Sequence, residues 1–156
     1  MTVTSSFKKG AAVAKAGVTG LCAGANIRTP CGDRRVEFLR PGDLVVTRDA
    51  GLRPVRLIWT QTVTAAEIAA DPSLAPIVVR PRAVGPMMPQ KSVSVGAAHK
   101  LLVPGWRLAD EDDTTSCLVP ARDVTQLSDD SFIDRSPEEV CYYNVVFDEH
   151  LVFCAN

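Results

Sequence analysis

Short apolar runs, each bounded by Gly or Pro, dominate the chain from residue 21 onward. Such spacing is typical of an all-β domain with many short strands, because turn-forming residues interrupt every apolar run before a long helix can form. We therefore predict an all-β fold, with strands at residues 25–29, 44–47, 55–63, 77–80, 100–103, 117–120 and 141–147.

One segment breaks this pattern and favours a helix at residues 64–71. Thr64 is placed to cap it, and Glu67 occupies the third helical position, as in a capping box. Asp71 precedes Pro72, which ends the helix because the residue before a proline avoids the helical region. A shorter helical turn is expected within residues 121–127.

The sharpest turn signal is the dipeptide Pro41–Gly42. Proline fixes φ at the first turn position, and glycine accepts a positive φ at the next. The apolar residues 44–46 follow directly. This segment predicts a β-turn that leads into a buried strand.

Composition fits an ordinary folded domain and excludes several classes of function. The chain has 156 residues, enough for one domain with a core, and a formal net charge of −1. The chain therefore has no excess of positive charge that would indicate binding to nucleic acid or to an anionic membrane. The longest apolar run is too short to cross a bilayer, and we expect an intracellular protein as synthesised, whether or not it is later exported within a larger one.

The five cysteines show no CxxC spacing, so neither a zinc site nor any other metal or cofactor is predicted. Residues 1–19 are rich in Ser, Thr, Ala, Gly and Lys, and are expected to be a mobile leader or upstream flank of a domain at 20–156. The acidic residues within 108–116 are interpreted as a solvated loop, since the alternation of calcium loops is missing.

Only two histidines exist, His99 and His150, and each enters an apolar strand. Each fits a structural histidine that bonds a backbone carbonyl. Together with a cysteine, two histidines from separate segments would also suit acyl transfer, in which a thiolate attacks an amide that a histidine polarises. The residues alone leave both interpretations open.

A family resemblance rests on several blocks in order. Residues 20–32, Gly-Leu-Cys-Ala-Gly-Ala-Asn-Ile-Arg-Thr-Pro-Cys-Gly, and the Leu-Arg-Pro-Gly-Asp turn at 39–43 resemble the opening of bacterial Hint domains, of the hedgehog/intein superfamily. Residues 93–103 and 143–156 resemble the family's histidine block and C-terminal block. The resemblance implies an all-β, horseshoe-like fold with pseudo-two-fold symmetry and one short helix.

The resemblance also implies a site. Cys22 would be the nucleophile that attacks the preceding carbonyl in an N-to-S acyl shift, His99 would activate the amide, and His150 would assist later steps. A second register, set by the glycine at position 24, places Gly20 instead of Cys22 at the nucleophile position. Gly96 stands where the family usually has Ser or Thr.

Two functions follow from these alternatives. The first is an autoprocessing domain that cleaves the bond before Cys22 once, with its own flanking polypeptide as substrate and related to domains that carry out protein splicing. The second is a catalytically degenerate Hint module that serves as a binding or structural unit.

Asn156 resembles the Asn of an internal Ala-Asn-Gly stretch in the family or, less closely, a cyclising Asn. A monomer is expected.

Overall fold

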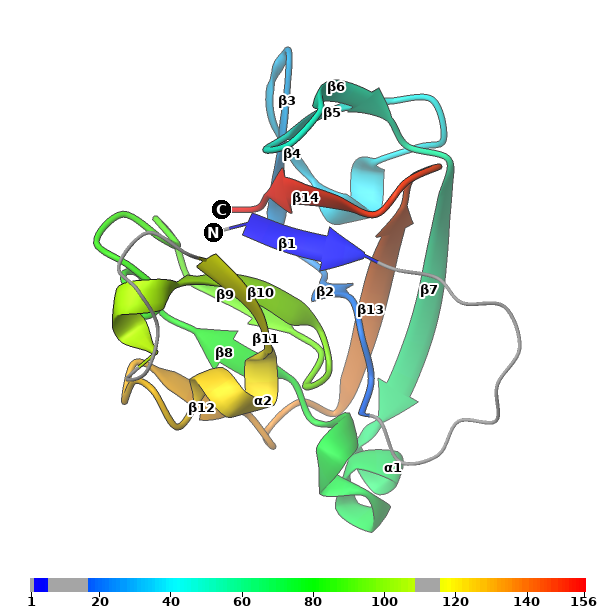
Figure 1. The fold of residues 1–156 in the computed structure, drawn as a ribbon. Coiled ribbons are helices and arrows are strands. Elements are labelled where there is room, and N and C mark those ends of the chain that lie inside the picture. The colour runs from blue at the N-terminus through cyan, green and yellow to red at the C-terminus, as the bar shows by residue number, and fades with distance from the viewer. Residues whose placement is uncertain (1, 6–16, 109–115) are drawn as a thin grey trace.

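The computed structural model describes residues 2–5, 17–108 and 116–156, and these residues form two six-stranded antiparallel sheets and one hairpin (Figure 1). In one sheet the strand order is β11 (Ser116–Pro120), β10 (Lys100–Pro104), β1 (Thr2–Ser5), β14 (Leu151–Cys154), β5 (Leu44–Thr47) and β6 (Gly51–Pro54). In the other it is β12 (Ser131–Ile133), β8 (Ile77–Val79), β9 (Val93–Val95), β2 (Leu21–Cys22), β13 (Glu139–Val146) and β7 (Leu57–Thr64). The hairpin joins β3 (Asn26–Thr29) to β4 (Gly32–Arg35).

The short strand β2 lies in the middle of its sheet. Leu21 pairs with Val95 of β9 on one side and with Tyr143 of β13 on the other. Its neighbour β13 pairs along its full length with β7, from Glu139 opposite Thr64 to Val146 opposite Leu57. The segment before β2 is therefore carried into the interior between β9 and β13.

The buried apolar side chains of the described residues form two clusters. The larger cluster spans both sheets and includes the fully buried Leu21, Ile27, Val45, Leu101 and Phe153. Burying a side chain of this size stabilises the fold by about 1.5–3 kcal/mol relative to leaving it exposed. The smaller cluster gathers seven residues around β2, β13 and the helix that follows β7: Val18, Cys22, Val63, Ile68, Ala75, Val140 and Tyr142.

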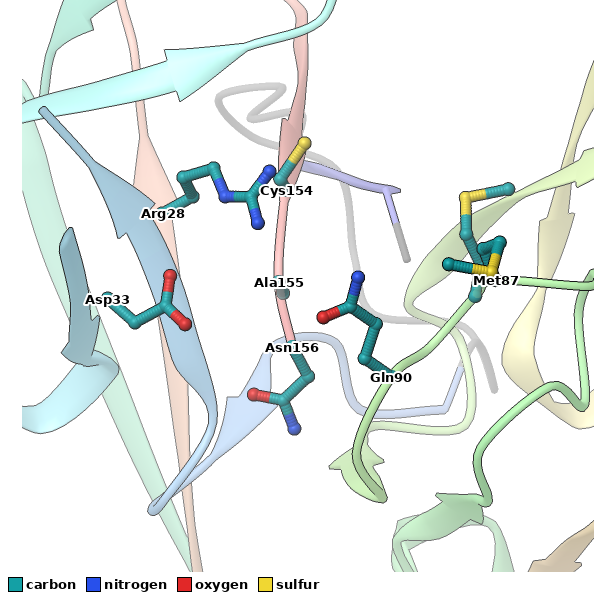
Figure 2. A pocket seen from close by; sticks show the side chains of 8 residues that line it. Arg28, Asp33, Met87, Gln90, Cys154, Ala155 and Asn156 are labelled. Carbon is teal, nitrogen blue, oxygen red and sulfur yellow. The ribbon is translucent and has the colours of Figure 1, made fainter.

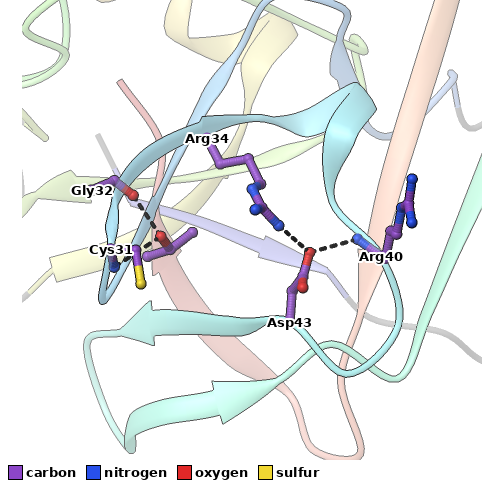
Figure 3. A network of polar contacts seen from close by, with 6 residues as sticks. Cys31, Gly32, Arg34, Arg40 and Asp43 are labelled. Atoms are coloured by element: carbon purple, nitrogen blue, oxygen red, sulfur yellow. Dashed lines mark hydrogen bonds and ion pairs between the residues drawn. The ribbon is translucent and has the colours of Figure 1, made fainter.

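The turn at residues 40–43 forms as predicted, with Gly42 at φ +91°. The Asp43 backbone N–H donates to the carbonyl of Arg40 at 3.0 Å, and the Asp43 carboxylate accepts from the Arg40 N–H at 2.9 Å and from Arg34 at 2.8 Å (Figure 3). The hydrogen bond from the Arg40 N–H is the main reason why the pKa of Asp43 lies below its usual value. Strand β5 follows at the residues that the sequence predicts.

Within the described residues, helical structure is confined to short segments. They are α1 (Ala65–Ala70), α2 (Ala121–Val124) and three 3-10 turns, η1 (Val36–Phe38), η2 (Pro72–Leu74) and η3 (Gly105–Arg107). Thr64 and Glu67 form the predicted capping box of α1. The fold is thus all-β, as the sequence predicts.

Several elements differ from the expected ones or were not expected. The strand predicted at 55–63 begins later, at Leu57, and the sequence pattern did not identify β2, β4, β6, β9 or β12. The apolar strand expected after His150 is β14. Thr2–Ser5, within the expected leader, forms β1, whereas residues 6–16 and most of the acidic loop, 109–115, lie outside the described residues. No helix among the described residues is long and apolar enough to cross a membrane.

The capping box predicts the effect of one substitution. The Thr64 hydroxyl accepts from the Glu67 N–H at 3.4 Å, and the Glu67 carboxylate accepts from the Thr64 N–H at 2.8 Å. Thr64→Ala removes the cap and should lower the free energy of unfolding by about 1 kcal/mol, as measured by urea unfolding. Thr64→Ser keeps the hydroxyl and should stay near wild type; equal stability of the two variants would contradict this role.

Candidate functional site

The peptide bond between Thr19 and Gly20 is held from both ends by buried side chains. The Gly20 N–H donates to Nδ1 of His99 at 3.1 Å. The Thr19 carbonyl accepts from Nδ2 of Asn144 at 3.3 Å, and the Thr19 hydroxyl donates to Oδ1 of the same Asn144 at 3.0 Å. A histidine from one segment and an asparagine from another thus hold one backbone amide.

His99 reaches this position through the turn between β9 and β10. Its backbone N–H donates to the Gly96 carbonyl at 2.9 Å, and its carbonyl accepts from the Ala121 N–H at 2.8 Å. Two further backbone bonds tie the turn to the segment before β2, from Ala98 to the Val18 carbonyl at 3.0 Å and from Gly96 to the Gly20 carbonyl at 2.8 Å.

Gly96 is needed for this close approach. A Cβ atom built at Gly96 would collide with the Val18 carbonyl oxygen, at a separation that side-chain atoms do not adopt. The hydroxyl residue that the resemblance leads one to expect at this position has no space here. The backbone of Val18 occupies that space.

Gly20 is also required by its backbone and its neighbours. Its backbone φ of +115° is one that residues with a side chain rarely adopt. A Cβ there would lie 3.0 Å from both Asn144 Nδ2 and the Tyr143 carbonyl oxygen. Gly20 therefore presents no side chain to the amide that His99 and Asn144 hold.

His99 is neutral in the folded protein. Only 3% of its surface is exposed, and burial lowers its pKa from 6.5 to about 3. Because Nδ1 accepts the Gly20 N–H, the single proton of the neutral ring lies on Nε2. That Nε2 is buried without a hydrogen-bond partner among the described residues. His99 can thus hold the amide, but its Nδ1 carries no proton to give to a leaving amine.

Cys22 lies two residues beyond this amide, on β2 opposite Tyr142. Its side chain belongs to the smaller apolar cluster and is 8% exposed. Burial, followed by the nearby Cys141 and Asp134, raises the pKa of the Cys22 thiol from 9.0 to about 12. At neutral pH it is a protonated, buried thiol, whereas nucleophilic cysteines have lowered pKa values.

His150 lies in the connection between β13 and β14 and is exposed, unlike His99. The next residue, Leu151, begins β14 in the other sheet, where it pairs with Ser5. The structure thus places the three residues singled out from the sequence in three environments: His99 at the amide, Cys22 in an apolar cluster and His150 at the surface.

Asn156 is fixed by four hydrogen bonds. Its side chain accepts from the Asn26 N–H at 2.6 Å and donates to the Ser92 carbonyl at 2.7 Å. Its backbone N–H donates to the Asn26 carbonyl at 2.8 Å, and its carbonyl accepts from the Gln90 N–H at 3.0 Å. A pocket lies beside it, with Arg28 and Asp33 on one side and Gln90 on the other (Figure 2).

A comparison with protein families decides the identity. The model of the Hint domain family matches residues 19–156. The chain belongs to the Hint domain family. Its superfamily is that of the intein-like autoprocessing domains. Searches among curated proteins and among solved structures found no match.

Two residues of the candidate site were missed from the sequence, Thr19 and Asn144. A signal existed for Asn144, since it is a polar residue inside the apolar strand predicted at 141–147, and it is 7% exposed. Buried amides of this kind need partners, so a polar residue in such a strand marks a hydrogen-bonded site. Thr19 gave no signal, because it lies in a segment of leader-like composition. No group of residues able to hold a metal ion is found among the described residues.

The lowered pKa of His99 predicts a pH dependence of stability. Between pH 6.5 and 3 the unfolded chain binds a proton at His99 and the folded chain does not. The stabilisation that comes from the lowered pKa of His99 is therefore complete above pH 6.5. Below that value, the free energy of unfolding falls by about 1.4 kcal/mol for each pH unit.

His99→Asn is the matched control, because its Oδ1 can accept the Gly20 N–H without titrating. Urea unfolding of both proteins at pH 7.5, 6 and 5 should show the wild type losing stability relative to the variant. A difference that stays constant over this range would mean that His99 titrates normally in the folded state.

Proposed function

We propose that this Hint domain is a non-cleaving member of its family. It is a binding module that holds its own polypeptide by hydrogen bonds at the Thr19–Gly20 amide. The observation that carries the proposal is the hydrogen bond from the Gly20 N–H to His99 Nδ1. It supports the register in which Gly20 occupies the nucleophile position. Glycine has no side chain with which to attack.

The N-to-S or N-to-O shift makes definite demands on a site. The side chain of the residue after the scissile bond attacks the preceding carbonyl, its proton is removed, and the amide nitrogen leaves with a proton. Gly20 cannot supply the attacking atom. Because burial lowers the pKa of His99 far below 7, the ring is neutral at pH 7 and its Nδ1 has no proton to donate.

The remaining contacts suit a holding role. Asn144 meets both the carbonyl and the hydroxyl of Thr19, and Gly96 and Ala98 bond the carbonyls of Gly20 and Val18. Gly20 and Gly96 can take part in these close contacts because neither has a side chain. Such a set of contacts positions an extended segment without providing a reaction path.

Self-cleavage before Cys22 is the second candidate, and one observation favours it. A buried cysteine lies on β2, two residues from the amide that His99 holds. Its thiol would attack the Leu21 carbonyl and its proton would pass to the Cys22 nitrogen, so that a thioester replaces the amide. Water or an added thiol would then cleave the thioester and separate the two segments. Burial, however, raises the pKa of this thiol to about 12, so the thiolate that would attack is scarce at pH 7.

Intact mass over time separates the two candidates. The full chain should be produced with a carrier protein fused ahead of Met1 and incubated at pH 7.5 with and without dithiothreitol. We predict one unchanged mass under both conditions, for the wild type, Cys22→Ala and His99→Asn alike.

The products would identify any reaction that occurs. A new N-terminus at Cys22 that disappears in Cys22→Ala would establish self-cleavage at that bond and overturn the proposal. Cleavage between Thr19 and Gly20 that depends on His99 would also contradict it. Circular dichroism of each variant serves as the folding control.

A further inference from the structure

Strand β1 completes the middle of a sheet formed by segments far along the chain. It pairs with β10 through Val3 opposite Leu101 and Thr4 opposite Lys100. On its other side it pairs with β14 over four residues, from Thr2 opposite Cys154 to Ser5 opposite Leu151 (Figure 1). The N-terminal segment therefore lies between the histidine block and the C-terminal block.

The two neighbouring edges form a place for one strand. Both β10 and β14 run antiparallel to β1, and β1 lies between them in the sheet order. Leu101 and Phe153, the residues opposite Val3, are both fully buried. Without a strand in this position, both edges would present unpaired backbone groups, and such edges readily pair with an extended peptide.

We propose that β10 and β14 form an acceptor groove for an extended peptide strand, and that the groove ties the N-terminal flank to the C-terminal block by backbone pairing. Its occupant is the segment Thr2–Ser5 of the same chain. The sequence Thr-Val-Thr-Ser suits an extended strand, since β-branched residues favour it. The recognition is β-augmentation, in which main-chain hydrogen bonds provide the binding.

This inference goes beyond the proposed function and is independent of it. The groove retains the flank whether or not a bond near residue 20 is ever cut. Cleavage measurements therefore test one claim, and occupancy of the groove tests the other.

Disulfide trapping tests occupancy in the full chain. Thr2→Cys would place a thiol opposite Cys154, and directly paired residues of antiparallel strands have the Cα separation that a disulfide needs. Oxidised glutathione is the oxidant, so that two protein thiols become one disulfide and one glutathione disulfide becomes two glutathione molecules. The linked cysteines are identified by peptide mass mapping without reduction.

The matched control is Thr4→Cys, since Thr4 pairs with Val152 in the register. We expect the Thr2→Cys variant to form its link to Cys154 at least about tenfold faster than the Thr4→Cys variant does, because only position 2 is in register. Adding Val3→Pro to Thr2→Cys should slow the link by about tenfold or more, since proline removes a ladder hydrogen bond.

The form of the product decides between outcomes. A bond within one chain supports the groove and its proposed occupant. A bond from position 2 of one chain to Cys154 of another would overturn the occupant, because the strand of a second copy would then fill the groove. Equal linking in the Thr2→Cys and Thr4→Cys variants, or no link to Cys154 while circular dichroism shows a folded protein, would overturn the proposal.

Discussion

The hydrogen bond from the Gly20 N–H to His99 Nδ1 is the contact on which the organisation of the site depends. It fixes the tautomer of a buried imidazole and joins the segment before β2 to the turn after β9. A protonated ring would put a donor against the Gly20 N–H, which is unfavourable in addition to the cost of burying a charge. The neutral ring is therefore part of the fold as well as of the site.

Close packing of backbone against backbone follows from this contact. Residues 18–20 lie against the turn at Gly96 on one side and against Asn144 and Tyr143 of β13 on the other. Gly20 and Gly96 leave space where side chains would collide. The tight fit that places the amide beside His99 leaves no space for a nucleophilic side chain at position 20. The residues that hold the chain in place therefore also limit its chemistry.

The sequence predicted those parts of the structure that local chemistry determines. The Pro41–Gly42 turn, strand β5 and the Thr64–Glu67 capping box depend on neighbouring residues, and all three were predicted correctly. Strands β1 and β2 were not predicted, because both are short and exist only through pairing with distant strands. The roles of Thr19 and Asn144 were missed for the same reason, since 125 positions separate these partners. His99 was identified by its scarcity and by the resemblance, but the amide it contacts depends on the register of the fold.

The tautomer and protonation state of His99 test this account most directly, and ¹⁵N NMR of the imidazole measures both at pH 7. The account predicts a neutral ring protonated at Nε2, with Nδ1 unprotonated and coupled across the hydrogen bond to a Gly20 amide that is protected from exchange. Loss of the coupling in His99→Asn, with the other resonances of β2 retained, would assign the signal. A ring protonated at Nδ1, or an imidazolium at pH 7, would contradict the central claim.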